Sequence, residues 1–549
     1  MPVTSSSLLT LLERAIGYLP GILGVLVSLI GLRLLAYFYD FFRHWEHYRG
    51  LPTQTTGDLM RLPTLPYLKI QITTRGTTGS TVVIRRVIRS ILDLVYDAPS
   101  LYGLLLSVEI VTENAQQKTL FEQEFAHTPL DVQVFVVPPD YQTARKTLCK
   151  ARAMHHMVEQ RRQGRNSKPG RTFILHCDEE SIMPPRELKK LLYYLATTKE
   201  QILMGPLYSS LQYRSVSTLC RVLEAHRPLH SFECHRAMLS GLPSQVYGTH
   251  FVIDEELENA LGWDIGNFDG KPILAEGFLF GLIAYLRYGR TVFGWHGCSL
   301  LEQPAFTYRS AFEQRYRQTQ SLLQSIALTG ILPDARKLPL KTRALLIWSA
   351  CYQLLTDTLS LPASMLAFGY TLYQSYLLLN NRLVLPLPLA LSPLLLWFAV
   401  VSILWLNTFF IGAWYNVSYA ELSRYQRVLE ILRVLALAPL AGIMESVATC
   451  WAIGQWIRGK RLALWQPTPK TLLATRGHHA STDKDDEIVL PVQEQRLRRF
   501  KELRRLRESR MHSSTRGKGI PRRYPISYPS SRPASYFASR PAIRRRLNA

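Results

Sequence analysis

A short apolar segment that stops at three consecutive acids is the part of this chain best suited to chemistry. The segment runs from Phe173 to Cys177, and Asp178, Glu179 and Glu180 follow it directly. A continuous apolar run predicts a buried parallel strand, and ligands of open α/β sheets bind just beyond the carboxyl ends of such strands. In an extended chain Asp178 and Glu180 point the same way, so they could hold one divalent cation against a nucleotide pyrophosphate. A solvated acidic loop is the alternative interpretation.

Polar and basic side chains also follow other predicted strands. Thr74 and Arg75 come after the first strand candidate, and Glu113 follows the second. Lys150 lies in a basic segment after the third strand, where it could neutralise phosphate charge. Each of these residues alone is typical of an ordinary protein surface. Their recurrence after successive strands favours a ligand site at one edge of a sheet.

Residues 63–335 alternate short apolar runs with longer amphipathic ones, which is typical of an α/β fold. We therefore expect a doubly wound sheet whose strands end at a common ligand-binding edge. The strand candidates are residues 67–73, 105–111, 132–137, 172–177, 202–205 and 247–253. The helix candidates are residues 82–95, 143–163 and 185–198.

The composition excludes a wholly disordered or disulfide-linked chain. Of the 549 residues 47% are hydrophobic, and the seven cysteines show no CxxC or metal-ligand spacing. This pattern indicates a reducing compartment. The formal net charge of +24 implies attraction to anions such as nucleic acid, anionic lipid or phosphorylated substrates, and charge alone does not choose among them.

Long apolar stretches indicate membrane helices. Residues 8–42 carry few charges and are too long for a cleaved signal peptide, so we expect a membrane anchor there. Residues 344–379, 383–414 and 431–456 each contain enough apolar residues to cross a bilayer. Glu445 inside the last stretch would be costly in lipid, so it should face other helices or protein.

The chain after residue 458 is rich in arginine, and residues 513–546 lack apolar periodicity, so we expect disorder there. A polybasic segment next to a membrane helix favours contact with an anionic cytosolic leaflet over nucleic-acid binding. One anchor and three later spans would place the central domain and this tail on opposite sides of the membrane. Either one apolar stretch is a hairpin or lies in the interface, or the positive-inside rule does not hold here.

Several unequal motifs follow one another along the central region. They are, in order, TTRG, VEIVTEN, VVPPDYQTARKTLCKARA, LHCDEES, YGTHFVI, WDIGNFDGKPILAEGFLFGLIAYLRYGR and PAFTYRSAFEQRYRQ. This series resembles the family 2 glycosyltransferases, and more narrowly the egghead-type β-1,4-mannosyltransferases and their bacterial relatives. The resemblance implies a doubly wound, glycosyltransferase-A-like α/β domain with transmembrane helices on both sides. We divide the chain into an anchor (1–50), a catalytic domain (63–335), transmembrane helices (343–457) and a basic tail (458–549).

The resemblance also implies roles for individual residues. Asp178 and Glu180 would bind Mn²⁺ or Mg²⁺ at the diphosphate of a GDP- or UDP-linked sugar. The residues implied to contact the donor are Thr74, Arg75, Glu113, Lys150 and Asp178. Those implied on the acceptor side or at the pyrophosphate are Gly248, Thr249, His250, Gln314, Arg315 and Arg317. Inverting sugar transfer needs a base for the acceptor hydroxyl and positive charge for the departing diphosphate, and these residue types suit those needs.

Two positions depart from the family pattern. Glu276 is followed by Gly277, where the family usually has the aspartate that serves as general base. Glu276 is the working base in one interpretation and a structural acid in the other, with Asp264 or Asp269 as alternative bases. Gln318 stands where the pattern leads us to expect Trp, so the acceptor sugar would lose an indole to pack against.

We expect an integral membrane protein whose cytosolic domain is an inverting glycosyltransferase. The resemblance implies a nucleotide-sugar donor, with mannose as first guess, and a lipid-linked or glycan acceptor beside the membrane. Nucleic acid is disfavoured as a partner. The alternatives are a processive polysaccharide synthase and a catalytically degenerate, nucleotide-sugar-binding membrane scaffold, the latter motivated by Gly277 and Gln318.

Overall fold

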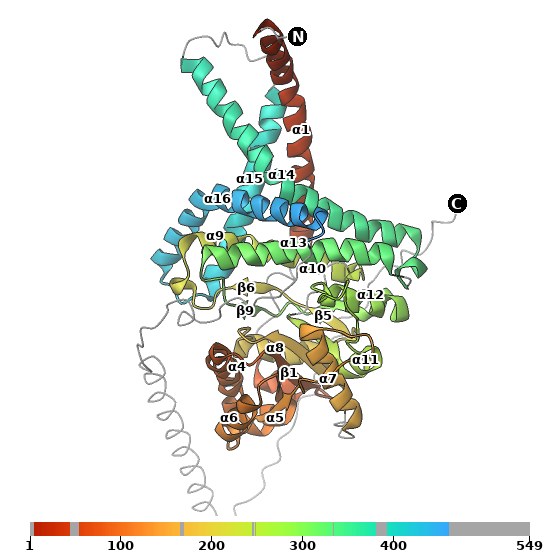
Figure 1. The fold of residues 1–549 in the computed structure, drawn as a ribbon. Coiled ribbons are helices and arrows are strands. Elements are labelled where there is room, and N and C mark those ends of the chain that lie inside the picture. The colour runs from red at the N-terminus through yellow and green to blue at the C-terminus, as the bar shows by residue number, and fades with distance from the viewer. Residues whose placement is uncertain are drawn as a thin grey trace, which may run out of the picture. The chain divides into compact units, whose positions relative to one another are not determined.

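The computed structural model describes most of the chain before residue 461 (Figure 1). Contacts divide the chain after residue 477, and everything described belongs to the first of the two units. Among the sequence predictions, Gly248, residues 383–391 and the tail from residue 461 lie outside the described part. The described residues are 5–43, 54–164, 170–243, 246, 249–332, 334–379 and 392–460.

A seven-stranded mixed sheet lies at the centre of the fold, with the strand order β3-β2-β1-β4-β7-β5-β8. Strands β1 to β4 are parallel, whereas β7 runs antiparallel to both β4 and β5. The expected α/β class is therefore confirmed. The strands of this sheet are β1 (Tyr67–Thr73), β2 (Leu106–Thr112), β3 (Asp131–Val136), β4 (Thr172–Asp178), β5 (Ile202–Met204), β7 (Phe251–Asp254) and β8 (Phe293–Trp295). A separate two-stranded sheet pairs β6 (Leu207–Ser209) with β9 (Leu300–Glu302).

Helices cover both faces of the large sheet, and each face has its own apolar core. In β4, Phe173 and Leu175 belong to the core shared with α4 and α8, whereas Ile174 belongs to the core shared with α7, α11 and α12. Side chains of a strand alternate between faces, so the apolar run of β4 is continuous because both faces are buried. The helices of this region are α3 (Thr56–Met60), α4 (Thr78–Asp97), α5 (Pro99–Leu105), α6 (Ala115–Phe125), α7 (Cys149–Gln163), α8 (Pro185–Thr197), α9 (Thr218–Ala225), α10 (Arg227–Leu239), α11 (Glu255–Leu261) and α12 (Glu276–Tyr288).

The helix predicted over 143–163 begins only at Cys149. The preceding residues form a loop in which the Thr143 hydroxyl accepts a hydrogen bond from the backbone N–H of Thr147 at 2.8 Å. Lys146 and Cys149 both have φ of 56°, a left-handed conformation that side chains other than glycine adopt rarely. Strain of this kind persists where the surrounding structure enforces it, often at functional sites.

A buried ion cluster attaches α7 to the sheet. The Arg161 guanidinium donates to Glu109 of β2 and to Glu258 of α11, each at 2.6 Å. Glu258 also accepts from Trp263 Nε1 at 2.6 Å and lies 2.7 Å from His176 Nε2 of β4. Burial alone would raise the pKa of Glu258, but His176 and Arg161 lower it to about 2. The cluster therefore holds a charged carboxylate inside the domain and fixes α7 against the strands.

Long helices precede and follow the α/β region (Figure 1). Three stretches, 24–43, 399–419 and 424–457, are long and apolar enough to cross a membrane. They lie in α1, α15 and α16, and the predicted span 344–379 lies in α14. The long helices are α1 (Ser5–Arg43), α13 (Tyr308–Ile331), α14 (Leu340–Leu379), α15 (Ser392–Tyr419) and α16 (Arg424–Ile457).

The Arg161 cluster gives a prediction about stability. Arg161→Met leaves the carboxylates of Glu109 and Glu258 buried without their guanidinium partner, so we expect a loss of about 3 kcal/mol or more. Thermal unfolding of the detergent-solubilised protein measures this loss. Arg162→Met is the matched control because Arg162 is exposed and donates only to the backbone carbonyl of Asn259. Equal melting temperatures for the two variants would contradict the prediction.

Candidate active site

The carboxyl edge of the central strands brings a lysine against the first of the three acids. Thr73 at the end of β1 pairs in register with Asp178 at the end of β4. Lys150, in the first turn of α7, donates from Nζ to Asp178 Oδ1 at 2.6 Å. Burial alone would lower the pKa of Lys150, but the carboxylate of Asp178 raises it above its usual value. The charges of Glu276 and Glu180 also raise the pKa of Lys150. Asp178, Glu180 and Glu276 therefore all lie within electrostatic range of this one ammonium group.

Glu276 is the first residue of α12 and is partly exposed. Desolvation raises the pKa of its carboxyl group to about 7, with a smaller upward effect from Asp178 and a downward effect from Lys150. A carboxyl group that titrates near neutral pH is suited to accept a proton from a substrate hydroxyl. Glu276 is thus within electrostatic range of Asp178, and its raised pKa suits the role of general base that the sequence predicts for it.

The two alternative bases have other surroundings. Asp264 accepts hydrogen bonds from the Arg145 backbone N–H at 3.0 Å and from the Thr147 hydroxyl at 2.7 Å. Burial would raise the pKa of Asp264, but these hydrogen bonds and one from Thr143 lower it overall. Asp269 is exposed in a left-handed turn. Asp264 therefore anchors the loop before α7, and Glu276 is the acid whose surroundings favour proton transfer.

Thr74 links the ends of β1, β2 and β4. Its backbone N–H donates to Val111 O at 2.8 Å, and its hydroxyl donates to Glu179 at 2.5 Å. Gly76 follows with φ of 74°, and a Cβ at this position would come within 2.4 Å of the Asn114 side chain. The chain therefore turns tightly beside the acids, and only glycine fits that turn.

The other predicted donor contacts lie at the same edge. Glu113 directly follows β2, and its carboxylate lies 2.5 Å from the Arg152 guanidinium of α7. Arg75 is exposed and donates to Cys149 Sγ at 3.6 Å. These contacts join the segments after β1 and β2 to the start of α7, so the predicted donor residues Thr74, Arg75, Glu113, Lys150 and Asp178 surround one region.

The predicted metal ligands are two carboxylates. Asp178 and Glu180 are separated by one residue, and Glu180 is 8% exposed. Within the described ranges no group of three or more His, Cys, Asp or Glu side chains could hold a metal ion. Mg²⁺ and Mn²⁺ are commonly bound through one or two carboxylates together with substrate phosphates and water. The pair therefore fits an ion shared with a diphosphate better than a closed protein site.

The predicted acceptor residues His250 and Thr249 differ in their exposure. His250 is buried, and its ring lies 4.8 Å from that of His296. Burial lowers the pKa of His250 to about 3, so the imidazole is neutral at physiological pH. Thr249 precedes it and is partly exposed. Both histidines are buried against Gly205, just after β5, so they do not form an open surface for a sugar.

Arg315 lies in a buried cluster between helices. It donates to the Leu223 carbonyl at 3.0 Å and to Gln318 Oε1 at 2.9 Å. It also pairs with Glu224 of α9 and Glu445 of α16, each at 3.5 Å. These contacts favour a structural role for Arg315, and a role at the pyrophosphate stays a prediction for it. Gln318, at the position expected for Trp, supplies one of these contacts.

Gln314 and Arg317 lie on the same helix, α13, and both are partly exposed. Glu445 pairs with protein side chains, as expected for an acid in an apolar stretch. The positions of Gln314 and Arg317 on α13 do not test their roles at the pyrophosphate or acceptor, so these roles stay predictions.

Sequence reasoning missed Arg227, at the start of α10. Its guanidinium lies 2.7 Å from Glu302 of β9 and 3.4 Å from Glu224. Burial would lower the pKa of Arg227, but Glu302 and Glu224 raise it, with further contributions from Glu180 and Asp178. Arg227 is therefore a second cation near Asp178 and Glu180, the pair predicted to bind a metal ion. No motif marks it, because Glu302, Glu180 and Asp178 come from distant segments and only Glu224 is a sequence neighbour.

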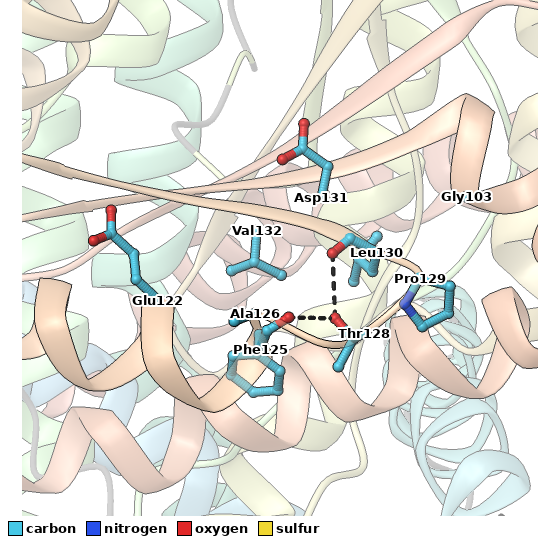
Figure 2. A pocket seen from close by; sticks show the side chains of 9 residues that line it. All are labelled: Gly103, Glu122, Phe125, Ala126, Thr128, Pro129, Leu130, Asp131 and Val132. Carbon is cyan, nitrogen blue, oxygen red and sulfur yellow. Dashed lines mark hydrogen bonds between the residues drawn. The ribbon is translucent and has the colours of Figure 1, made fainter.

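A pocket of about 340 Å³ opens at the opposite end of the sheet (Figure 2). It is lined by the end of α6 and the start of β3, and Thr128 donates there to the carbonyl groups of Phe125 and Leu130. Because β3 begins at this end, the pocket is at the amino edge of the parallel strands. It is therefore remote from the predicted site, which is at the carboxyl edge.

Residues 173–417 match the profile of the family described as Glycosyl transferase family group 2. No curated protein sequence matches the chain. Among solved structures, the chain is similar to the mannosyltransferase PcManGT from Pyrobaculum calidifontis in complex with GDP-Man and Mn²⁺. The identity is 14%, covering 78% of this chain and 99% of that one, with a TM-score of 0.39. For S. aureus TarS 1-349 the identity is 13%, covering 72% and 92%, with a TM-score of 0.28.

Both TM-scores are below 0.5, so the assignment of the α/β fold depends on the strand order and not on these similarities. The family match begins in β4, includes the three acids, Arg227 and Glu276, and ends in α15. The narrower resemblance to egghead-type mannosyltransferases stays a prediction. With its acids at the carboxyl edge of an α/β sheet and a family match over residues 173–417, this region of the chain is similar to the family 2 glycosyltransferases, which supports glycosyltransferase activity.

Proposed function

We propose that the protein is a membrane-bound inverting glycosyltransferase that moves a sugar from a nucleotide-sugar donor to a lipid-linked or glycan acceptor. Mannose is the first choice of sugar because of the motif resemblance described above. The observation that carries the proposal is the cluster of Lys150, Asp178 and Glu276. It combines a cation, a ligand for a metal ion and an acid with a pKa of about 7.

In this proposal Glu276 accepts the proton of the acceptor hydroxyl as its oxygen attacks the anomeric carbon of the sugar. A new glycosidic bond forms while the bond from that carbon to the phosphate oxygen breaks on the opposite face. The departing nucleoside diphosphate carries the electron pair away. Lys150 and Arg227 are the cations that would offset this negative charge.

The donor would lie along the carboxyl ends of β1, β2 and β4. Thr74, Arg75 and Glu113 come from the first two strand ends and would contact the nucleotide. Asp178 and Glu180 would hold Mn²⁺ or Mg²⁺, which supplies positive charge at the diphosphate when bound. Lys150 already contacts Asp178, so donor binding has to redistribute the partners of this lysine.

Replacement of Asp178 tests whether the cluster is catalytic. Membranes that contain the protein should release GDP or UDP from one member of a nucleotide-sugar panel when Mn²⁺ is present. Asp178→Asn should lower this release roughly 100-fold or more, because it removes a metal ligand and the partner of Lys150. Asp131→Asn is the matched control, because Asp131 is exposed at the start of β3, at the amino edge of the sheet. A donor that binds without any turnover would favour the degenerate scaffold, the alternative raised by Gly277 and Gln318.

The pKa of Glu276 gives an expected pH profile. The base must be deprotonated, so kcat/KM should rise with pH up to about 7 and level off above it. Well below pH 7 the rate should fall roughly tenfold for each pH unit. Glu276→Gln should lower the rate by about 10² to 10⁴ and remove this acidic limb. If the residual activity of Glu276→Gln still falls below pH 7 in the same way, the pH dependence belongs to another group.

Contacts of α16 bear on the arrangement at the membrane. Glu430 lies 3.1 Å from Arg221 of α9, and Gln320 of α13 donates to the Ala452 carbonyl at 3.0 Å. Trp456 stacks on Phe268 of the α/β domain with ring centres 5.8 Å apart. From Glu430 to Trp456 the helix is about 39 Å long. A helix that touches one domain over this length lies along it and does not leave it to cross a bilayer.

The opposite face of α16 is apolar and exposed. Its residues recur at helical spacing, so they form one stripe. This stripe consists of Leu429, Leu432, Leu440, Ile443, Val447 and Trp451. We infer that α16 lies in the membrane interface, with this stripe toward lipid and its charged partners toward the domain.

If α16 lies in the interface, two membrane-crossing helices remain after the α/β domain, α14 and α15. Arg33 of α1 pairs with Glu233 of α10 at 3.1 Å and with Asp357 of α14 at 2.7 Å, which marks the domain side of the membrane. From residue 358 to Leu379 α14 has no charged residue, and α15 returns toward the domain. With α14 and α15 as a crossing pair and α16 in the interface, the domain and the basic tail lie on one side. The positive-inside rule then makes that side cytosolic.

Epitope tags test this arrangement in sealed microsomes. A tag after His127, in the exposed turn before β3, and a tag at the C-terminus should both be cleaved by added protease. A tag inserted between α14 and α15 should be protected, which is the internal control. Protection of the C-terminal tag with cleavage of the His127 tag would show that α16 crosses the membrane.

A further inference from the structure

A second pocket, of about 380 Å³, lies between the start of α8, the ends of β5 and β8 and the last turns of α15. Strand β5 is antiparallel to β7, which is antiparallel to β4, and β8 is parallel to β5. The carboxyl ends of β4, β5 and β8 therefore share one edge of the sheet. Trp295 ends β8 and lines this pocket, so the pocket opens at the same edge as Asp178.

One wall of the pocket is aromatic. Tyr208 of β6 stacks on Tyr415 of α15 with ring centres 5.1 Å apart and an interplanar angle of 3°. Tyr419 stacks on the same ring at 5.4 Å, and Trp414 also lines the space. Flat aromatic surfaces are suited to the apolar faces of sugar rings and to the first isoprenoid or acyl units of a lipid.

The other wall provides hydrogen-bond donors and positive charge. Trp295 is 4% exposed, and its indole N–H has no hydrogen-bond partner among the residues that the structure describes. Such a buried donor is normally satisfied, so a missing ligand is the simplest partner for it. Arg186 lies in the first turn of α8, where the helix dipole also favours an anion.

The neighbouring acid of this wall is already neutralised. Glu187 accepts from Lys190 Nζ at 2.9 Å and from the backbone N–H of Ser299 at 3.1 Å. Its negative charge is therefore balanced inside the protein, and the pocket is left with a net attraction for anions.

We propose that this pocket binds the phosphate and first sugar of a lipid-linked sugar phosphate, the acceptor of the reaction. The inference rests on the proposed function. Residues 399–419 of α15 are long and apolar enough to cross a membrane and end in the pocket, so the lipid tail can stay in the bilayer. The phosphate then meets Arg186, the sugar stacks on the tyrosines, and the far end of the acceptor extends along the sheet edge toward Glu276.

Binding to the purified full chain in nanodiscs tests this proposal without requiring turnover. The probe is a short polyprenyl-phosphate-linked mannose, compared with methyl mannoside and with polyprenyl phosphate alone. The wild-type protein should bind the conjugate at least tenfold more tightly than either fragment. Arg186→Gln and Trp295→Phe should each weaken this binding about tenfold. Arg186 is exposed, so its variant should fold normally even if the Trp295 variant does not.

Matched controls are Lys189→Gln, three residues after Arg186 on α8, and Trp348→Phe, an exposed tryptophan of α14. Both should bind as the wild type does. If the wild type turns over a nucleotide sugar while all four variants bind the conjugate equally, the pocket proposal fails and the proposed function stands. Methyl mannoside binding as tightly as the conjugate also overturns it. No turnover together with unchanged binding removes both proposals.

Discussion

The seating of α7 on the sheet depends on one buried guanidinium. Arg161 lies three turns along α7 from Lys150, and its two ion pairs join this helix to β2 and α11. A buried ion pair contributes little net stability, but removal of one partner is costly. The cluster therefore contributes mainly by fixing the position of α7 on the sheet. In that position Lys150 contacts Asp178. The site at one end of the helix is fixed by charges buried at the other.

At the carboxyl edge, neighbouring acids are given different chemistry by their surroundings. Asp178 has a lysine at 2.6 Å, whereas Glu276 is desolvated and titrates near pH 7. A carboxylate paired with a cation stays ionised and is suited to hold a metal ion, and a carboxyl with a raised pKa can exchange a proton. The absence of an aspartate after Glu276 does not leave the site without an acid that could act as base. Helix α12 begins at that acid, which lies within electrostatic range of Lys150 and Asp178.

Local sequence patterns predicted most strands of the central sheet and the position of the acids, but they missed the short strands β6, β8 and β9. The apolar run before Asp178 required a strand buried on both faces, and β4 is such a strand. The sequence predicts helix for the loop 143–148 because its basic residues extend the basic face of the following helix, whereas its conformation is set by contacts with Asp264, more than a hundred residues away. Arg227 and the partners of Arg315 were out of reach for the same reason. The periodicity of residue types predicts which residues share one face of a helix or strand. It cannot predict ion pairs between elements that are distant in the sequence.

The helices next to the membrane are joined to the α/β domain by close packing as well as by charge. A Cβ on Gly412 of α15 would lie 1.7 Å from the carbonyl oxygen of Ala225, so α15 touches the end of α9 through its bare backbone. Beside this contact, Asn416 of α15 donates to the Glu224 carbonyl at 3.0 Å, and the Glu224 carboxylate pairs with Arg315. Arg315 in turn pairs with Glu445 of α16. Separating the domain from these helices would expose several buried charges at once. The fold thus requires the carboxyl edge of the sheet to stay beside α15 and α16, and under the proposed function this would place the site next to an acceptor held in a membrane.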